Sequence, residues 1–323
     1  MRKAMAEAEV GDEQRFADPT TGALQERVAE LLGHDAALFL PSGTMCNLIG
    51  FRLHLRPGGD EAILDRTSHP VHFEAGGAAA FSGAMLAQVD GDGGVFEPAQ
   101  VEAAVRPAGD RYGPRSRLVS VEQTTNIGGG RVWPLEMVRG VIEVARRHGL
   151  RTHLDGARLM NAVVASGVPA ADWASGFDTA WIDFTKGLGA PVGAVLAGSR
   201  ELIDEAWRYK QMAGGALRQS GVLAAACLHA LDHHVDRLAE DHEHARLLAT
   251  GLAELPGIEL IRPPETNILV ARVPDAFALV ARLAERGVEV SPLGSDRIRC
   301  VTHLDVDRAG IERALRAFAE ASG

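Results

Sequence analysis

A single lysine follows a short hydrophobic segment in the sequence WIDFTKGLGAPVG, residues 181–193. Residues 181–184 predict a short buried strand, and a glycine-rich turn around Lys186 follows it directly. Small and apolar residues dominate downstream, and Asp183 is the only nearby carboxylate. A desolvated lysine has a lowered pKa and can be the nucleophile that forms a Schiff base. An ordinary loop lysine on the surface is the alternative, so the rest of the chain must supply a cofactor site.

A second candidate is the aspartate that ends the predicted strand RTHLD, Asp155. Ligands of open α/β sheets bind beyond the carboxyl ends of the strands, which places Asp155 and Lys186 at one site. A carboxylate here can hold the proton of a pyridine nitrogen and thereby keep a ring cofactor an electron sink. Capping of the helix that follows is the alternative role for this aspartate.

A phosphate site is predicted where LFLPSGTMCN passes from a strand through a small-residue turn into a helix. This arrangement places the backbone amides of Gly43, Thr44 and Met45 at the positive end of that helix. The motif is neither a Walker loop nor a G-x-G-x-x-G motif, which disfavours nucleotide binding, and an unliganded turn is the alternative. The triple glycine in TTNIGGGRVWP predicts instead a connection that passes close to another segment.

The elements that must position these residues alternate between helix and strand from residue 23 to about residue 199. Such alternation predicts crossover units and a mostly parallel sheet with helices on both faces. The predicted strands are 36–41, 61–66, 85–90, 117–123, 151–155, 178–184 and 192–198. The clearest helices are 22–33, 45–55 and 134–149, with Pro134 in the first turn of the last.

The C-terminal part has a different pattern. Residues 201–255 are almost wholly helical in character, and a smaller α+β region follows, so we expect a large cofactor-binding domain over 1–240 and a small domain over 241–323. The predicted elements of the small domain are strands 267–273 and 297–304 and helices 275–287 and 307–321.

Composition limits the class of protein. With 323 residues, 46% of them hydrophobic and 24% charged, the chain is typical of a soluble globular enzyme. Its net charge of −10 argues against nucleic-acid or anionic-membrane partners. No apolar run approaches a membrane helix, and the N-terminus lacks a signal-peptide core. Three widely spaced cysteines (Cys46, Cys227 and Cys300) are expected to be buried packing residues and suit a reducing cytoplasm.

The phosphate turn, the aspartate and the lysine follow the chain order of pyridoxal-phosphate enzymes of fold type I, the aspartate-aminotransferase fold. The chain resembles the low-specificity L-threonine aldolases of the β-eliminating lyase superfamily. The stretches that carry the resemblance extend from residue 10 to residue 305: VGDEQRFADPT, FLPSGT, SHPVHFEAGGAA, HLDGARLMNAVVASG, TKGLGAPVGAVLAG, GGALRQSGVLAAA and VTHLD.

The resemblance assigns a role to each residue of a cofactor site. It implies that Lys186 forms the Schiff base, that Asp155 is the partner of the pyridine nitrogen, and that Gly43 and Thr44 bind the phosphate. It also implies that His69 stacks on the cofactor ring. A position in the first turn of a helix is the alternative for His69, and a core histidine is the expected role of His153.

Arginines complete the site that the resemblance implies. Arg158 and Arg299 are expected to clamp the substrate carboxylate, which suits a guanidinium fork. Pairing with Asp155 is the alternative for Arg158. For Arg299 the alternative is a surface pair with Arg297, and we expect one of these two arginines to face inward and the other outward. Arg218 matches a family arginine near the cofactor phosphate that reaches a neighbouring subunit.

The chain departs from the family pattern at several places. The Ser-Asp-Thr run that family members carry near the N-terminus is missing, and Thr125 stands where many members have a histidine beside the substrate. Arg15 stands where the family has a tyrosine. The histidines of HALDHHVDRLAEDHEHAR (229–246) resemble a metal site only superficially, because no third ligand is evident, and a solvated helical face is expected.

The implied reaction is retro-aldol cleavage of L-threonine or L-allo-threonine to glycine and acetaldehyde, with pyridoxal 5′-phosphate as cofactor. The implied assembly is a homo-oligomer, a dimer or a tetramer. Another pyridoxal-phosphate enzyme, such as a β-eliminating lyase or an aminotransferase, is the nearest alternative. A regulatory protein that binds the cofactor without turnover is the alternative from another class.

Overall fold

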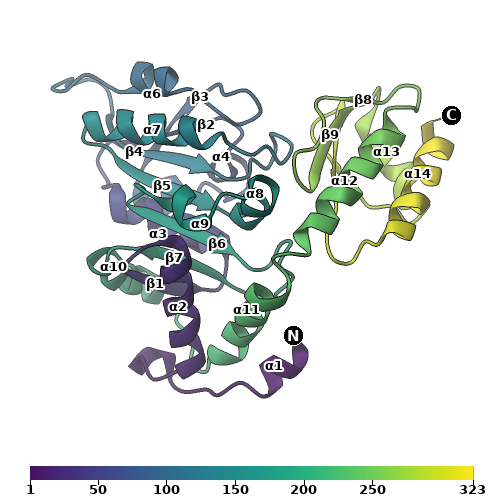
Figure 1. Cartoon of the computed structure of the whole chain (residues 1–323). Helices are drawn as coiled ribbons and strands as arrows, with labels where there is room; N and C mark the ends of the chain where they lie inside the picture. The colour runs from purple at the N-terminus through teal and green to yellow at the C-terminus, as the bar shows by residue number, and fades with distance from the viewer. Residues whose placement is uncertain (323) are drawn as a thin grey trace.

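The chain forms two sheets, each with its own helices. In the computed structural model, which describes residues 1–322, the larger sheet has seven strands in the order β1-β7-β6-β5-β4-β2-β3 (Figure 1). Every predicted strand of this part is present, with ends that differ by at most two residues. The strands are β1 (Ala36–Leu40), β2 (Asp60–Asp65), β3 (Met85–Val89), β4 (Arg115–Glu122), β5 (Arg151–Gly156), β6 (Thr179–Asp183) and β7 (Ala194–Gly198).

The sheet is mostly parallel, as predicted, and β7 is the exception. It pairs antiparallel with both β6 and β1, whereas the pairs β6–β5, β5–β4, β4–β2 and β2–β3 are parallel. The turn after β6 contains no crossover helix, so β7 returns directly beside β6. The carboxyl ends of the other strands therefore lie at one edge of the sheet.

Helices cover both faces of the large sheet. Alternate residues of β1 are buried on opposite faces of the sheet, so both faces need a cover of helices. Phe39 packs on one face with α2 and α7, whereas Leu38 and Leu40 pack on the other with α3 and α10. Pro134 precedes α7 as its N-cap residue. The helices before the small domain are α1 (Arg2–Ala6), the 3-10 helix η1 (Glu13–Arg15), α2 (Pro19–Leu32), α3 (Gly43–His54), α4 (His69–His72), α5 (Gly77–Ser82), α6 (Pro98–Ala104), α7 (Leu135–Arg147), α8 (Leu159–Ser166), α9 (Ala170–Ala174), α10 (Arg200–Met212) and α11 (Gly221–His233).

The histidine-rich segment differs from its prediction. It forms two helices, α11 and α12 (Leu238–Leu252), and His242 on α12 is buried rather than solvated. The rings of His229 and His233 lie 4.4 Å apart, and His229 Nε2 contacts the N-terminal amine at 3.0 Å. Within residues 1–322, no group of three or more His, Cys, Asp or Glu side chains is arranged to hold a metal ion.

The small domain has a hydrophobic core of its own, which includes Leu252, Leu269, Ile298 and Phe318. Its sheet has the order β10-β11-β9-β8, with all three pairs antiparallel. A separate core supports the division of the chain, although the boundary at residue 240 stays a prediction. The remaining elements are β8 (Glu259–Leu260), β9 (Ile268–Arg272), α13 (Ala276–Ala284), β10 (Ser291–Pro292), β11 (Arg297–Val301) and α14 (Arg308–Ser322).

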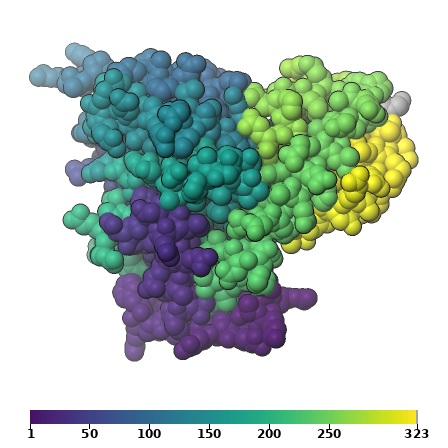
Figure 2. Space-filling view, in the orientation of Figure 1, coloured from purple at the N-terminus to yellow at the C-terminus, as the bar shows by residue number. Residues whose placement is uncertain are grey.

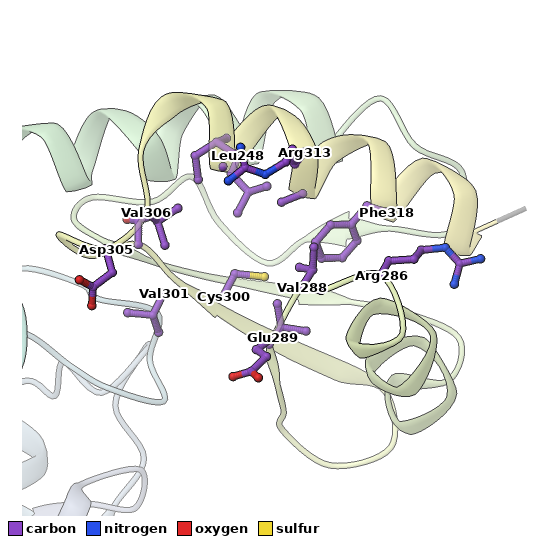
Figure 3. A pocket seen from close by; sticks show the side chains of 16 residues that line it. Leu248, Arg286, Val288, Glu289, Cys300, Val301, Asp305, Val306, Arg313 and Phe318 are labelled. Carbon is purple, nitrogen blue, oxygen red and sulfur yellow. The ribbon is translucent and has the colours of Figure 1, made fainter.

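A hollow of about 230 Å³ lies between β11 and α14 (Figure 3). Cys300 and Phe318 point into it, and Arg286 and Asp305 lie at its opposite ends (Figure 3). All three cysteines are buried and free, as predicted. None of the described helices is both long and apolar enough to cross a membrane.

The small domain packs against the large one (Figure 2). One contact is at the triple glycine, where Thr266 Oγ1 donates to the carbonyl of Gly130 at 2.6 Å. A Cβ atom at Gly130 would lie 2.5 Å from Thr266 Oγ1, and one at Gly128 would lie 2.0 Å from the carbonyl oxygen of Gly93. The prediction that the glycines allow a close passage is therefore confirmed, and the passage fixes the small domain beside the site.

Candidate active site

Residues from several strand ends meet at the carboxyl edge of the large sheet. Asp155 lies in β5, and Lys186 follows β6. Glu122 ends β4 and accepts a hydrogen bond from the backbone amide of His69, which follows β2. Gly43 follows β1, and a Cβ atom there would lie 2.9 Å from Asp183 Oδ2. The edge therefore gathers an amine, an imidazole, carboxylates and a helix N-terminus.

Lys186 lies in a turn that Asp183 organises. Asp183 Oδ1 accepts from the backbone amide and the hydroxyl of Thr185, each at 2.7 Å, and its Oδ2 lies 3.2 Å from Lys186 Nζ. The amine also lies 5.7 Å from the centre of the Trp181 ring. The side chain of Lys186 is 29% exposed, so the ion pair and partial solvation replace the desolvated environment that the sequence predicted.

The sequence contains only three lysines, and their surroundings differ sharply. Lys3 is exposed on the N-terminal helix, beside Glu7. Lys210 is fully buried and forms an ion pair with Glu13. Lys186 is therefore the single lysine that is both at the sheet edge and open to a hollow, which has a volume of about 380 Å³. This hollow extends to Asn267 and His303 of the small domain.

The turn before α3 has the form of an anion site. Ser42 is the N-cap residue, and its hydroxyl accepts from the amide of Met45 at 3.3 Å. A side chain at Gly43 would lie 2.4 Å from the Trp181 ring, so only glycine allows the helix to begin this close to β6. The amide of Met45, which the sequence analysis also offered to the phosphate, is therefore occupied by Ser42, and the amides of Gly43 and Thr44 are left for an anionic ligand.

Asp155 is 2% exposed and is held by donors on both oxygens. Its Oδ2 accepts from Asn47 Nδ2 at 2.8 Å, and its Oδ1 accepts from the amide of Ala157 at 3.1 Å. The N-cap residue of α8 is Arg158, so the alternative that Asp155 caps this helix is wrong. A Cβ atom at Gly156 would lie 2.0 Å from the carbonyl oxygen of Trp181, which explains the glycine beside the aspartate.

His69 forms a pair with Glu74, a residue that sequence reasoning did not single out. Nδ1 of His69 lies 2.8 Å from Glu74 Oε1, and the two side chains are 28% and 1% exposed. Burial alone lowers the pKa of His69, but the hydrogen bond with Glu74 and the charge of Asp155 outweigh it and raise the pKa. His69 also begins α4, directly after the N-cap residue Ser68, so its backbone has the place that the alternative gave it, and its stacking on a cofactor ring stays a prediction.

Glu122 bonds to two segments at the carboxyl edge of the large sheet. Its Oε2 accepts from the amide of His69 at 2.8 Å, and its Oε1 accepts from the amide of Asn126 at 2.6 Å. Burial and the nearby charge of Asp155 raise the pKa of Glu122 to about 7. Asn126 in turn accepts a hydrogen bond from Arg299 Nη1, so the small domain is linked to the same carboxylate.

Arg158 and Arg299 form a cationic pair without a carboxylate bound to either one. The Arg158 guanidinium makes no hydrogen bond or ion pair with another side chain of the described chain, so pairing with Asp155 is wrong. Burial, together with the charge of Arg299, lowers the pKa of Arg158 to about 10. Nε of Arg299 is buried and has no protein partner. Two such cations suit a small planar anion.

Arg297 and Arg299 lie on the same face of β11, because the alternate residues Ile298 and Cys300 enter the small-domain core. The expectation that one faces inward and the other outward was therefore wrong in its geometry. What separates them is position along the strand. Arg297 lies beside Asp296 at the exposed end, whereas Arg299 reaches Asn126 of the large domain. The surface-pair alternative is excluded by that contact.

Known proteins resemble this chain along nearly its whole length. Residues 1–276 match the family model of the beta-eliminating lyases. The chain belongs to the β-eliminating lyase family. It is 40% identical to the probable low-specificity L-threonine aldolase 2 of Arabidopsis thaliana, over 98% of this chain and 92% of that protein. It is also 40% identical to the low specificity L-threonine aldolase of Escherichia coli (strain K12), over 98% and 95%.

Solved structures show the same fold. The structure of Leishmania major threonine aldolase superposes with a TM-score of 0.81 at 22% identity, over 95% of this chain and 91% of that one. The serine palmitoyltransferase of Sphingomonas wittichii superposes with a TM-score of 0.74 at 20% identity, over 99% and 81%. The expected fold type I architecture is confirmed for this chain.

Three further residues that the sequence analysis named are Thr125, Arg218 and His153. Thr125 is buried, and its hydroxyl accepts from the amide of Arg131 at 3.2 Å. Arg218 is 63% exposed and pairs with Asp12 of its own chain at 3.1 Å. Its role near a phosphate therefore stays a prediction that requires a second chain. His153 is fully buried, as expected for a core histidine.

Proposed function

We propose that this protein cleaves L-threonine, L-allo-threonine and related β-hydroxy-α-amino acids into glycine and an aldehyde, with pyridoxal 5′-phosphate bound at Lys186. The observation that carries the proposal is that Lys186 and Arg158 line one hollow, and that the charges of Lys186 and Asp155 both act on the His69–Glu74 pair. The 40% identity to low-specificity L-threonine aldolases over nearly the whole chain supports the same reaction.

The residues at the edge fit this cofactor. An amine suits its aldehyde, the buried carboxylate of Asp155 suits its protonated pyridine nitrogen, and the amides of Gly43 and Thr44 suit its phosphate. His69 supplies a flat ring to lie against it. A Cβ atom at Gly43 would lie 2.9 Å from Asp183 Oδ2, so the glycine lets this turn lie against the strand that leads to Lys186. When bound, the cofactor supplies an electron sink for the pair of electrons released from the broken Cα–Cβ bond.

Arg158 and Arg299 have the task of holding the substrate carboxylate. Both guanidinium groups are largely desolvated, and the free Nε of Arg299 offers a donor that the protein itself leaves unused. A carboxylate bound there restores hydrogen bonding and neutralises part of the buried charge. Arg158 belongs to the large domain and Arg299 to the small one, so a substrate carboxylate bound to both also links the two domains.

His69 has the task of taking the proton from the substrate β-hydroxyl. Its Nδ1 is engaged with Glu74 at 2.8 Å, which leaves Nε2 as the nitrogen that faces other partners. The raised pKa makes His69 a stronger base. The hydroxyl of Thr125 is a donor and acceptor and cannot replace an imidazole as base.

The proposal also covers the assembly and the location of the protein. We propose a homo-oligomer, a dimer or a homotetramer, in which Arg218 approaches the cofactor phosphate of a neighbouring subunit. Its exposed guanidinium, held only by Asp12, supports a role between chains. The three free, buried cysteines support a reducing, cytoplasmic location.

Product analysis tests the proposed reaction. Purified protein supplied with pyridoxal 5′-phosphate and L-threonine is expected to release glycine and acetaldehyde in equal amounts. Ammonia with a keto acid identifies elimination, and an amino-group transfer to an added keto acid identifies an aminotransferase. Cofactor uptake without any product identifies the regulatory alternative, and any of these three results overturns the proposal.

A further inference from the structure

Asn47 lies inside helix α3, is 1% exposed, and contacts four other groups through its side-chain amide. Its Oδ1 lies 2.8 Å from Trp181 Nε1 and 3.1 Å from His153 Nε2. Its Nδ2 lies 2.8 Å from Asp155 Oδ2 and 2.7 Å from Glu74 Oε1. A single amide therefore joins the aspartate proposed to face the pyridine nitrogen to the partner of His69.

Chemistry determines which way this amide points. The indole nitrogen of Trp181 can only donate, so the atom beside it must be the amide oxygen. The amide nitrogen then faces two carboxylates, which can only accept when they are ionised. Each of the two amide protons meets one carboxylate, so Asn47 uses its full donor capacity on Asp155 and Glu74.

The tautomer of His153 follows from the same orientation. His153 Nε2 must carry a proton in order to donate to the oxygen of Asn47. Burial lowers the pKa of His153 to about 3, so the ring is neutral and its Nδ1 is an acceptor. It accepts from the hydroxyl of Thr179 at 2.8 Å, and that oxygen in turn lies 2.9 Å from His54 Nε2. All the donors of this chain therefore point toward the two carboxylates.

We propose that Asn47 is a positioning residue that couples Asp155 to the His69–Glu74 pair, because its two amide protons are donated to both carboxylates in one buried cluster. This inference rests on the proposed function for the roles of Asp155 and His69, but the network itself is a property of the protein without cofactor.

The charges around His69 give the direction of the effect. Glu74, Glu122, Asp155 and Lys186 face or contact it from four different segments. The amide proton of Asn47 bonds to the same Oε1 of Glu74 that pairs with His69. Without this donor the negative charge of Glu74 and Asp155 is stabilised less by hydrogen bonds. The protonated form of His69 is then favoured more strongly, so the pKa of His69 should rise.

The test uses cofactor-free protein with ¹⁵N-labelled histidine. We expect Asn47→Leu, which keeps the volume but has no donor, to raise the titration midpoint of His69 by about one pH unit, which corresponds to about 1.4 kcal/mol. Thr179→Val is the matched control, because it breaks the same chain beyond His153 and leaves both donors of Asn47 in place. It is expected to leave that midpoint unchanged.

Cofactor and substrate give a second measurement. In Asn47→Leu we expect the visible band of the bound cofactor to titrate at a different pH, and kcat for L-threonine to fall at least tenfold with KM changed less, because Arg158 and Arg299 are untouched. A purely structural role would lower stability in both variants and move neither titration. Equal shifts in Asn47→Leu and Thr179→Val, or none in Asn47→Leu, overturn the proposal.

One measurement needs no variant and does not depend on folding of Asn47→Leu. In the wild-type protein the nitrogen shifts of His153 are expected to show a proton on Nε2 and an acceptor at Nδ1. The opposite tautomer reverses the orientation of Asn47 and overturns the coupling. If the wild type shows the expected tautomer but cleaves no substrate, the proposed function fails and the network stands.

Discussion

Replacing Glu74 by glutamine isolates the charge that sets the basicity of His69. Glutamine keeps the shape of the side chain and an oxygen that can accept from Nδ1, so the ring stays in place while its anionic partner is lost. The pair is close, 2.8 Å between Nδ1 and Oε1, and the carboxylate is almost completely buried, so solvent screens it little.

The size of the effect follows from this geometry. A hydrogen bond to a charged group contributes about 1.5–3 kcal/mol, and about 1.4 kcal/mol corresponds to one pKa unit. The pKa of His69 is therefore expected to fall by about one to two units. A weaker base also slows proton removal, so the rate on the plateau should fall by roughly three- to tenfold.

The assay is the pH dependence of kcat/KM for L-threonine between about pH 5 and pH 9, followed by coupled reduction of acetaldehyde. The acidic limb of this profile reports the pKa of the base in the free protein, and it should move to lower pH in Glu74→Gln. His69→Phe should remove this limb entirely and lower the rate much further while the cofactor still binds. Glu102→Gln is the matched control, since Glu102 forms a similar pair with His148 at 2.6 Å on the surface. An acidic limb that stays in place in Glu74→Gln, with cofactor bound, refutes the role given to this pair.

Four other expectations concern separate parts of the structure. Asp155→Asn should retain the cofactor, which absorbance will show, and should lower kcat by about 10²- to 10³-fold, because an amide does not hold a protonated ring nitrogen. A wild-type rate in this variant would mean that Asp155 only contributes packing. Arg299→Lys should raise KM for L-threonine by about tenfold or more in steady-state assays with less change in kcat, and an unchanged KM would remove Arg299 from the carboxylate site. His242 is 3% exposed, and burial lowers its pKa to about 4, so between about pH 6.5 and pH 4 only the unfolded chain binds a proton at this residue. The free energy of unfolding should therefore fall by about 3 kcal/mol as the pH falls over this range. Urea titrations of His242→Gln should lack this part of the pH dependence of stability. Light scattering should show a dimer or tetramer at assay concentration, and a fully active monomer would contradict a site completed by Arg218.

The fold was predictable where local pattern and connection length agree. Strand–helix alternation predicted all seven strands of the large sheet, because buried parallel strands are short apolar runs between helices. Short helices such as α4 and α5 were not predicted, since a few residues carry no periodicity. The break between α11 and α12 was missed because His234 and Arg237 are compatible with a helix. In the folded chain, His234 Nδ1 lies 2.6 Å from the carbonyl oxygen of Leu188, a contact that a local pattern does not reveal.

The site was predictable only where a residue ends a strand or matches a family motif. Asp155, Lys186 and the turn at Gly43 all follow the rule that ligands lie beyond the carboxyl ends of strands. The same rule applied to β4 would have indicated Glu122. Asn47 and Glu74 carry no such signal, because the partners that give them meaning are distant in sequence. Asn47 lies 108 residues from Asp155, so their contact is evident only in the folded chain.

The central claim is that the cofactor is bound covalently at the sheet edge, and reduction with borohydride tests it most directly. The protein has three lysines, so peptide mapping after reduction has only three possible results. We expect a yellow protein whose visible band disappears on reduction, with the whole label on Lys186 and none on Lys3 or the buried Lys210. A colourless protein that takes up no added pyridoxal 5′-phosphate, or a label on either of the other two lysines, would contradict the account.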